Sequence, residues 1–453
     1  MSGTTRQLGS LGTMRILVDG FNLALTKGTG VATYARNLTY CLQGMGHDVA
    51  VLYGVSGART KTPLMREVSF FDHYEGAPQS KGWLRRAASA AFNPLPRTAY
   101  PIELSGAVIY RQFASKLPFY DSLWNSPHLY DIAHTRFRLY QRRLTVSSPE
   151  ATNIAHWTYP IPIKHRTAKN IYTLHDLVPL RLPYTTLDKK GFYYKLLKKI
   201  ASQADHIVTV SETSKRDIIN LLGVEEHKIT NTYESVTIPP EYLRITEGLL
   251  QEELFGRFGL NYKEYMLYYG SIEPKKNVTR IIEAHLASNI GIPLVVIGAQ
   301  AWISEREQQL LKTFSLGAGE SGRAGQIRDA KLMHFDYVSF GRLITLIRGA
   351  RAIVFPSLYE GFGLPILEGM LCETPVITSN FGSMSEIADD ACLLVDPYNT
   401  YDIKGAIIAA AGDKGLCDAK ISRGKIVAER YSPQAHQRRL GEAYEKVSRA
   451  RPR

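Results

Sequence analysis

Two carboxylates that lie eight positions apart, Glu360 and Glu368, flank a glycine turn in the last third of the chain. The apolar run 352–355 precedes them and predicts a central parallel strand, whose carboxyl end faces a ligand crevice. Gly361 and Gly363 lack Cβ atoms where the backbone would approach a bound group. Because carboxylates accept hydrogen bonds from hydroxyl groups, the pair can hold two diols, such as a sugar ring and a ribose joined by a diphosphate.

A helix is predicted directly after this turn, because Pro365 lacks an N–H group and suits the first turn of a helix. The free amides of Phe362, Gly363 and Leu364 would then point at a phosphate or at sugar oxygens. The alternative is an ordinary strand-to-helix turn with a glutamate beside the helix dipole. The position between a strand, two glycines and a helix favours the ligand site.

A second predicted strand-to-helix turn begins with Gly270 and Ser271 and continues to Lys275 and Lys276. An ammonium group at this place can neutralise a diphosphate without a metal ion. The alternative is a pair of solvated lysines at the start of a helix.

His175 follows the apolar strand predicted at 171–174 and is therefore expected at a strand end, in the cleft. Two interpretations stay open, a packing histidine with satisfied hydrogen bonds or a contact with the ligand. Asp176 either orients the imidazole or caps the end of the strand.

Gly28, Thr29 and Gly30 open a predicted helix, but they lie ten residues beyond the first strand and no third glycine follows at the dinucleotide spacing. A nicotinamide-binding fingerprint is therefore not expected. The three residues form either a helix N-terminus aimed at the donor phosphate or the acceptor, or a turn with an N-cap.

These motifs together resemble the retaining glycosyltransferases of family 4, also described as glycosyltransferase group 1, which have the GT-B fold. The Glu-Pro-Lys-Lys-Asn stretch at 273–277 and the His-Asp stretch at 175–176 are most similar to the mannosyltransferase-like branch. The resemblance extends over segments 175–180, 210–218, 270–278, 360–368, 373–379 and 382–387, and it thins between about residues 55 and 150.

The resemblance implies roles for the site residues. His175 would contact the transferred sugar, and Lys276, with Lys275, would neutralise the donor diphosphate. Glu360 would hold the sugar hydroxyls and Glu368 the ribose diol. The family retains anomeric configuration, and the resemblance implies front-face attack without a dedicated protein nucleophile. No metal or other cofactor is expected, because the lysines can neutralise the diphosphate. Many relatives carry an arginine where this chain has Ser271, so charge neutralisation would rest on the lysines and the helix termini.

Strands alternate with helices along the chain, which predicts an α/β protein with two doubly wound Rossmann-like domains facing each other across a cleft. Residues 1–243 would form an N-terminal acceptor domain with a basic, aromatic insertion over about 55–150. Residues 244–431 would form the nucleotide-sugar donor domain. A connection between the domains is predicted at 241–253, and by resemblance the final helix, about 432–453, packs back onto the first domain.

The strands and helices that must position the site are predicted from apolar periodicity. Strands are expected at 14–19, 48–53, 154–157, 170–174, 206–210, 265–269, 294–297, 337–340, 352–355, 375–378 and 393–395, and helices at 30–46, 189–204, 213–222 and 432–447.

Composition is that of an ordinary globular protein, since 44% of the 453 residues are apolar. The polar segment 1–13 lacks the apolar core of a signal peptide, and no run reaches the roughly 18 apolar residues of a membrane span, so a cytoplasmic location is expected. The four cysteines show no C-x-x-C pairing, which predicts free thiols and no zinc site.

Charge is unevenly distributed within the formal net of +13. Residues 81–169 carry thirteen basic and four acidic side chains, a net of +9, with apolar and aromatic residues between the arginines. Such a stretch suits an anionic membrane surface, and a solvated basic face is the alternative. Nucleic acid is not an expected partner, because no zinc-finger, homeodomain or RNA-recognition motif is present.

The expected reaction is transfer of a hexose, mannose from GDP-mannose first, onto a glycolipid or lipid-linked oligosaccharide at the inner face of the cytoplasmic membrane. Three alternatives remain. The donor can be a UDP- or dTDP-sugar. The same fold can support an epimerase or phosphorylase, and a noncatalytic subunit can bind a nucleotide sugar as a scaffold, although such subunits often lose a site carboxylate or the lysine.

Overall fold

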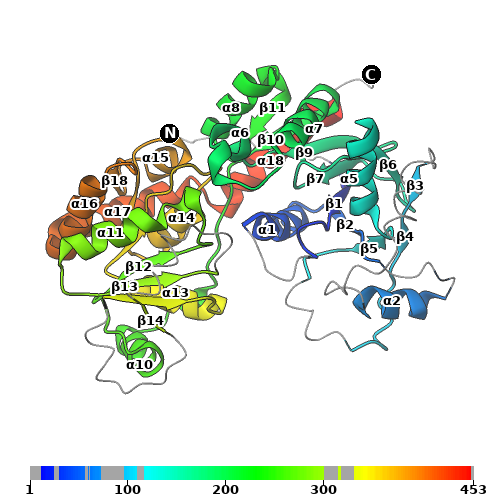
Figure 1. The fold of residues 1–453 in the computed structure, drawn as a ribbon. Helices are drawn as coiled ribbons and strands as arrows, with labels where there is room; N and C mark the ends of the chain where they lie inside the picture. The colour runs from blue at the N-terminus through cyan, green and yellow to red at the C-terminus, as the bar shows by residue number, and fades with distance from the viewer. Residues whose placement is uncertain are drawn as a thin grey trace, which may run out of the picture.

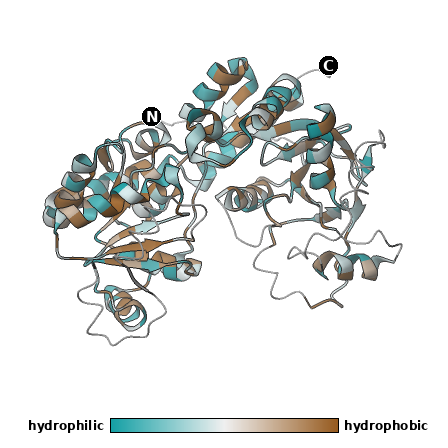
Figure 2. Ribbon diagram, in the orientation of Figure 1, coloured by the Kyte–Doolittle hydropathy of each residue, from teal (hydrophilic) through white to brown (hydrophobic). Residues whose placement is uncertain are grey.

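The computed structural model describes residues 12–24, 30–56, 60, 62–72, 96–109, 117–299, 315–317 and 331–449. These residues form two α/β units, each built on its own parallel sheet, and the two sheets lie on opposite sides of Figure 1. Apolar residues gather along the strands at the centre of both units, as the brown ribbons of Figure 2 show. The predicted architecture of two doubly wound domains is confirmed.

The first domain contains an eight-stranded sheet in the order β11-β10-β9-β7-β1-β2-β5-β4, parallel except for the β4–β5 pair. Successive apolar side chains on both faces of the central strands fit a sheet that helices cover on both sides. The strands are β1 (Arg15–Asp19), β2 (Asp48–Tyr53), β4 (Tyr100–Pro101), β5 (Ser122–Asn125), β7 (Ile154–Trp157), β9 (Lys169–Thr173), β10 (His206–Thr209) and β11 (Ile229–Asn231); β3 (Arg97–Thr98), β6 (Leu144–Ser147) and β8 (Ile163–His165) form a small separate sheet.

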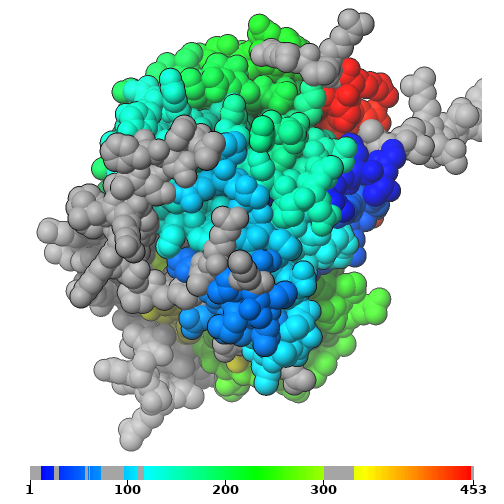
Figure 3. All heavy atoms as spheres, turned by 90° about the vertical axis from the view of Figure 1, so that its right-hand side faces the viewer, coloured from blue at the N-terminus to red at the C-terminus, as the bar shows by residue number. Residues whose placement is uncertain are grey.

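Helices cover this sheet where the periodicity predicts them. In α1 the side chains of Tyr34, Leu38 and Leu42 are buried at helical spacing, which gives the helix one apolar face. The helices of the first domain are α1 (Gly30–Gly44), α2 (Pro63–Asp72), α5 (Leu129–Tyr140), α6 (Val178–Arg181), α7 (Lys190–Gln203) and α8 (Glu212–Leu222). In Figure 3 α2 lies on the surface of this domain, and its Leu64 and Met65 side chains are exposed.

The second domain contains a seven-stranded sheet in the order β14-β15-β13-β12-β16-β17-β18, in which all pairs are parallel. Its strands are β12 (Met266–Tyr269), β13 (Leu294–Ile297), β14 (Ser315–Gly317), β15 (Leu332–Phe335), β16 (Ala352–Phe355), β17 (Val376–Ser379) and β18 (Leu393–Val395). Its helices are α9 (Pro240–Leu243), α10 (Glu247–Phe258), α11 (Val278–Ser288), α13 (Phe340–Gly349), α14 (Leu364–Leu371), α15 (Gly382–Ala388), α16 (Thr400–Gly412) and α17 (Lys414–Glu429).

The connection predicted at 241–253 contains two helices that the sequence analysis did not predict. These are α9 and α10, and α10 buries Leu250, Leu254 and Phe258 at helical spacing. One predicted strand is wrong in this domain. The strand predicted at 337–340 lies at Leu332–Phe335 instead. Tyr337 is 82% exposed, so its ring does not belong to a strand core, and residue 340 already begins α13.

The last helix, α18 (Pro433–Arg449), crosses back to the first domain, and Figure 1 shows it in red between the two units. Tyr444 of this helix lies 2.6 Å from Nδ1 of His156 in β7, and the ring of His436 contacts the carbonyl oxygen of Thr232 at 3.1 Å. These buried contacts hold the end of the chain against the first sheet. The predicted domain boundary at residues 243 and 244 falls between α9 and α10 and stays a prediction.

Two sequence features have simple outcomes. The four cysteines are free, as predicted. In the described part of the chain, no helix combines the length and the apolar character that a membrane span requires.

Candidate functional site

The glycine turn joins β16 to α14 at the carboxyl end of the second sheet. Gly363 has a φ of 128°, a conformation that side chains disfavour, and α14 begins at the next residue. The hydroxyl of Ser383 donates to the carbonyl oxygen of Glu360 at 2.8 Å, and that of Ser379 donates to the carbonyl oxygen of Ser357 at 2.5 Å. The backbone around Glu360 is therefore fixed by the last residue of β17 and by the first turn of α15.

Lys276 and Glu360 form a nearly buried ion pair between two loops of this edge, with 15% and 10% of their side chains exposed. Lys276 lies in the short 3-10 turn Pro274–Lys276 after β12, and its Nζ is 2.6 Å from Oε1 of Glu360. Lys275 Nζ is 3.9 Å from Oε2 of the same carboxylate and 3.8 Å from Oε1 of Glu273. The structure thus brings the predicted lysines and the first predicted carboxylate together.

Charge keeps this cluster ionised in spite of its burial. Burial alone would raise the pKa of Glu360, but the ammonium groups of Lys276 and Lys275 outweigh it and lower that pKa. Burial would lower the pKa of Lys275, but Glu360, Asp176 and Glu273 outweigh it and raise the pKa of this lysine. Positive charge is therefore retained where a diphosphate would need it.

Asn277 is a site residue that the sequence interpretation did not single out. Its buried Nδ2 donates to the carbonyl oxygens of Pro356 at 3.0 Å and Pro397 at 2.7 Å, and the amide of Leu358 donates to the carbonyl oxygen of Lys275 at 2.7 Å. These bonds join the turn that contains Lys275 and Lys276 to the loop that contains Glu360. The sequence did contain a signal for this role, because an amide side chain directly follows the two lysines.

Glu368 lies in α14, and its Oε2 accepts a hydrogen bond from the hydroxyl of Tyr269 at 2.6 Å. Tyr269 is the last residue of β12, so it holds the second carboxylate at the same edge of the sheet. Burial raises the pKa of Glu368, and the hydrogen bond from Tyr269 opposes that rise. Gly270 directly follows this strand, and Ser271 donates through its hydroxyl to Glu273 at 2.9 Å.

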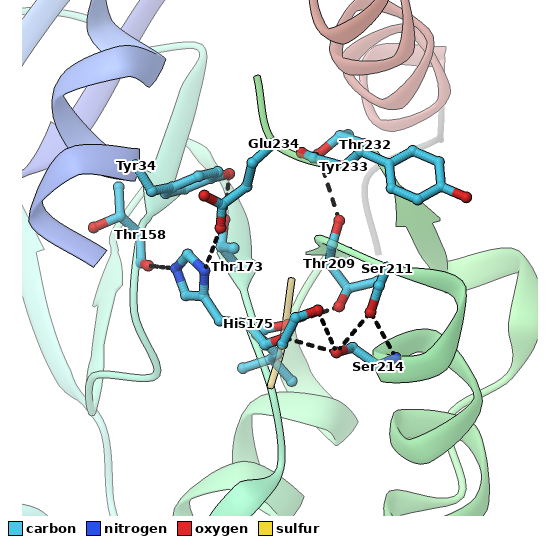
Figure 4. A network of polar contacts seen from close by, with 12 residues as sticks. Tyr34, Thr158, Thr173, His175, Thr209, Ser211, Ser214, Thr232, Tyr233 and Glu234 are labelled. Carbon is cyan, nitrogen blue, oxygen red and sulfur yellow. Dashed lines mark hydrogen bonds and ion pairs between the residues drawn. The ribbon is translucent and has the colours of Figure 1, made fainter. Parts of the chain in front are cut away.

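His175 follows β9, and Figure 4 shows its ring between Glu234 and the carbonyl oxygen of Thr158. The distances are 3.3 Å from Nδ1 to Oε1 of Glu234 and 3.0 Å from Nε2 to the carbonyl oxygen. Tyr34 of α1 meets the ring edge-on, with ring centres 4.7 Å apart. Asp176 has no hydrogen bond to the ring among the described residues. Its carboxylate accepts a hydrogen bond from the amide of Val178, so it lies at the start of α6 and does not cap the end of the strand.

Two histidines of neighbouring strands have opposite pKa shifts. Burial opposes charge on His175, but the hydrogen bond and the charge of Glu234 raise its pKa. Burial, together with nearby histidines, lowers the pKa of His156 to about 3. Such a divergence between buried groups is typical of functional sites, although structural networks produce it too.

The two domains touch at this point. A Cβ atom on Gly361 would lie 2.5 Å from the carbonyl oxygen of His175, so the glycine turn packs directly on the first domain. The hydroxyl of Ser214 donates to that carbonyl oxygen at 2.8 Å. Glu386 of α15 accepts hydrogen bonds from the amides of Glu212 at 2.7 Å and Thr213 at 3.0 Å, which caps α8 from the other domain. His175 and the glycine turn therefore lie at the same contact between the domains.

A cavity of about 270 Å³ opens between the domains. It is lined by residues of both, including His175, Asp176, Tyr159, Glu273 and Lys275. A larger cavity of about 550 Å³ is lined by Lys263, Arg351 and Pro375, which precede β12, β16 and β17. That cavity lies at the amino ends of the strands, opposite the ion pair, so the smaller cavity is the one that belongs to the site.

The remaining predicted site residues differ in their outcome. Phe362 is buried, and its ring lies 6.4 Å from that of Tyr233, while Leu364 is the first residue of α14. Gly30 begins α1 and is exposed. Gly28 and Thr29 lie outside the described residues. Within the described ranges, no three or more His, Cys, Asp or Glu side chains cluster as a metal site would require.

Comparison with known families identifies both halves of the chain. Residues 251–427 match the model of the "Glycosyl transferases group 1", and residues 28–236 match the model of "Glycosyltransferase Family 4". The first match contains the site residues Lys275, Lys276, Glu360 and Glu368. The second match contains His175 and Glu234.

Two curated relatives have bacterial surface polysaccharides in their names. The O-antigen chain mannosyltransferase B of Escherichia coli is 30% identical over 275 residues, 60% of this chain and 68% of the relative. The O-antigen chain mannosyltransferase RfbU of Salmonella typhimurium is 27% identical over 252 residues, 56% of this chain and 62% of the relative. The matched segment thus spans less than two thirds of the second relative.

Solved structures share the fold over nearly the whole chain. A glycosyltransferase from Rickettsia africae has a TM-score of 0.58 at 15% identity, with 97% of this chain and 100% of that chain covered. A sucrose-phosphate synthase from Thermosynechococcus elongatus has a TM-score of 0.63 at 14% identity, with 96% and 99% covered. Anabaena HepE in complex with UDP-glucose has a TM-score of 0.60 at 13% identity, with 95% and 98% covered. The predicted GT-B fold is confirmed.

Proposed function

The chain belongs to the glycosyltransferases of group 1 and family 4, and from this premise we propose that it transfers a hexose from a nucleotide-diphosphate sugar with retention of anomeric configuration. The preferred donor is GDP-mannose. The acceptor is a glycolipid or lipid-linked saccharide in cell-surface polysaccharide synthesis.

The observation that carries this proposal is the ion pair between Lys276 and Glu360 at the carboxyl end of the second sheet. As the bond to the diphosphate breaks, the sugar becomes oxocarbenium-like and negative charge grows on the phosphate oxygens. Lys276, Lys275 and the free amides of α14 can stabilise this charge from fixed positions, without a metal ion. Catalysis then depends on positioning and electrostatics.

Retention follows from front-face attack, in which the leaving phosphate takes the proton of the acceptor hydroxyl. The hydroxyl oxygen bonds to the anomeric carbon as the bond to the phosphate oxygen breaks, and the proton ends on that oxygen. His175 lines the cavity between the domains and can contact the transferred sugar. Glu360 binds the sugar hydroxyls, and Glu368, held by Tyr269, binds the ribose diol.

Mannose is preferred because the relatives named above are mannosyltransferases and because the segments 273–277 and 175–176 are most similar to that branch. A UDP- or dTDP-sugar donor is the alternative, and Anabaena HepE, which shares the fold, was solved with UDP-glucose.

A membrane-bound acceptor is supported by a basic face near the cavity. Residues 181–199 contain six basic side chains and one acidic one, a net of +5. Tyr184, Leu187 and Tyr194 of this segment are 66%, 73% and 42% exposed, and Leu187 also lines the cavity. Exposed apolar groups among lysines suit an anionic lipid surface, and we propose a peripheral location at the inner face of the membrane. Five of the basic residues predicted earlier for this role, Lys81, Arg85, Arg86, Arg111 and Lys116, lie outside the described residues.

A donor screen tests the proposed function. Purified protein is incubated with GDP-mannose, UDP-, dTDP- and other GDP-sugars in the presence and absence of bacterial membranes, and nucleotide release and sugar incorporation are measured. A transferase incorporates sugar into lipid and hydrolyses the donor only slowly without an acceptor. Turnover without acceptor indicates an epimerase or phosphorylase, and binding without turnover of any donor indicates a scaffold subunit.

A further inference from the structure

Glu234 touches His175 from the segment that leads out of the first sheet toward the second domain. It lies 59 positions from His175 in the chain, and both side chains are nearly buried, with 9% and 12% exposed. Burying a carboxylate costs free energy unless a partner compensates it, so the close approach to the ring accounts for its position. No other carboxylate among the described residues has a hydrogen bond or ion pair with this ring.

The contacts of the ring define its protonation. The carbonyl oxygen of Thr158 can only accept a hydrogen bond, so Nε2 of His175 carries a proton. Nδ1 faces Oε1 of Glu234 at 3.3 Å, and the hydrogen bond and charge of Glu234 raise the pKa of His175. The raised pKa favours the imidazolium form, which forms a pair without net charge with a carboxylate.

The other titratable groups around the pair are few. Asp176, on the same loop as His175, adds negative charge at longer range. His156 from β7 and His436 from α18 are kept neutral by burial, and Tyr34 from α1 meets the ring edge-on. Glu234 is thus the group whose charge decides the state of the ring.

The backbone of Glu234 is anchored at the crossing between the domains. Thr232 bonds through its amide to the carbonyl oxygen of Thr209 at 3.0 Å and accepts a contact from His436 of the returning helix. Tyr233 has a φ of 56°, which turns its side chain away from that of Glu234. The centre of its ring lies 5.2 Å from that of Tyr431 and 6.4 Å from that of Phe362 in the glycine turn.

We propose that Glu234 is a positioning residue for the transfer reaction, which holds the His175 imidazolium in a fixed orientation so that its Nε2–H can bind a hydroxyl of the donor sugar. The Nε2–H now bonds to the buried carbonyl oxygen of Thr158. His175 itself and Tyr159, the residue after Thr158, line the 270 Å³ cavity, so a sugar hydroxyl bound there can compete for this proton. Because Glu234 balances the charge, the ring donates this bond without placing net positive charge beside the oxocarbenium-like sugar. This inference rests on the proposed function.

The direct test is an NMR titration of His175 in wild type, Glu234→Gln and Glu234→Asp, with the signal assigned from its loss in His175→Asn. The Gln variant keeps the shape and removes the charge. In wild type the pKa of His175 lies above that of free histidine, and in Glu234→Gln it falls below it. The Asp variant restores part of the rise. An unchanged pKa in Glu234→Gln would overturn the proposal.

Kinetics separate this role from simple stabilisation. With the nucleotide sugar that wild type uses, Glu234→Gln lowers kcat about tenfold with a small effect on KM, and the alkaline limb of the pH profile moves to lower pH. Glu234→Asp recovers most of the activity. A loss that is equal at every pH, with no recovery in the Asp variant, would contradict the positioning role.

Glu225→Gln is the matched control, because Glu225 lies nine positions earlier and is 65% exposed. It changes neither the pKa of His175 nor the pH profile. The titration requires no substrate, so it decides the Glu234 proposal even where the donor screen finds no transfer. If Glu234→Gln fails to fold, the Asp variant and the wild-type titration alone decide whether His175 is charged at neutral pH.

Discussion

The Nζ atom of Lys276 lies 2.6 Å from Oε1 of Glu360, although the two residues belong to different strand-to-helix loops. The strands before these loops, β12 and β16, are neighbours in the second sheet, so their carboxyl ends bring both side chains to one edge. Asn277 then ties the two loops together through Pro356. The lysine and the glutamate therefore form one structural unit, to which the proposed function assigns the donor.

Replacing Lys276 by Gln removes a fixed charge from the place where the leaving diphosphate becomes more negative. We expect kcat to fall about 100- to 1000-fold, with a smaller change in KM for the donor. Steady-state kinetics measure both values. Lys446→Gln is the control, because this exposed lysine lies on α18, far from the donor loops in sequence. Wild-type turnover in the Lys276 variant would remove the lysine from the mechanism.

Glu360→Gln and Glu368→Gln each weaken a contact with one diol of the donor. At about 1.5–3 kcal/mol for a hydrogen bond to a charged group, donor use should drop roughly 10- to 150-fold. The ratio kcat/KM for the donor measures the effect. Glu429→Gln, at the exposed end of α17, is the control and is expected to match wild type. Full activity in both site variants would refute the carboxylate roles.

Gly361→Ala tests the contact between the domains. The new Cβ would lie 2.5 Å from the carbonyl oxygen of His175, which is backbone and cannot rotate away. The closed arrangement is then strained, and we expect kcat to fall at least tenfold while nucleotide binding by the second domain persists. Calorimetric titration with the nucleotide and turnover assays separate the two effects.

Gly405→Ala is the matched control for this substitution. Gly405 lies inside α16, and no atom lies within 4 Å of an added Cβ. Alanine is the better helix former by about 1 kcal/mol, so this variant should be slightly more stable and fully active. Equal activity of the two glycine variants would show that the contact at Gly361 has no role in turnover.

The basic face at residues 181–199 is tested by flotation with liposomes. Reversing the charge of the exposed Lys189 and Lys195 should abolish binding to vesicles rich in anionic lipid, because each lysine near such a surface contributes about 1 kcal/mol. Reversal of Lys414 and Lys446, two exposed lysines of the C-terminal helices, is the control. If both double variants float like wild type, this face is merely solvated.

Acid should destabilise the protein at pH values well above those at which most carboxylates titrate. Burial lowers the pKa of His156 to about 3 and that of three further histidines to about 4, namely His165, His206 and His285. Their pKa values are lower folded than unfolded, so the unfolded chain binds more protons, and stability is lost as pH falls through about 6.5. Urea unfolding at pH 7.5 and 5.5 measures the difference.

Groups with raised pKa values oppose this trend. Burial raises the pKa of Asp19 to about 6 and also raises that of Glu368, and the contribution of His175, whose folded pKa is raised, is complete below about 6.5 and is lost as pH rises. Burial lowers the pKa of three more histidines, His47, His134 and His436, so the groups with lowered values outnumber the opposing ones and predict a lower free energy of unfolding at pH 5.5. A value equal to or above that at pH 7.5 would contradict the burial of these histidines in neutral form.

The sequence was sufficient for the elements whose side chains are local and apolar. The strand at Ala352–Phe355, the turn with Gly361 and Gly363, and the helix that follows all lie within twenty residues of one another. Their burial and turn chemistry can therefore be derived from neighbouring residues. The sequence analysis missed α10 because the segment resembles a polar linker. Its buried positions Leu250 and Leu254 alternate with five polar or charged residues and with glycines.

The partners of the site side chains could not be derived in the same way. Glu234 meets His175 across 59 positions, and Glu386 caps α8 across 174 positions. Such contacts depend on how the two sheets are placed, which periodicity within one segment does not determine. Asp176 is the carboxylate residue nearest to His175 in sequence, but its side chain accepts a hydrogen bond from the amide of Val178 and does not reach the His175 ring.

The configuration of the product tests the central claim most directly. Purified protein, GDP-mannose and membrane acceptor are combined, and the anomeric signal of the newly attached sugar is followed by NMR from the first minutes, with the weakened variant Glu360→Gln as the reference. We predict transfer of the sugar with the anomeric configuration of the donor retained. Transfer with inversion, or nucleotide release that is the same in wild type and in Glu360→Gln, would contradict the account.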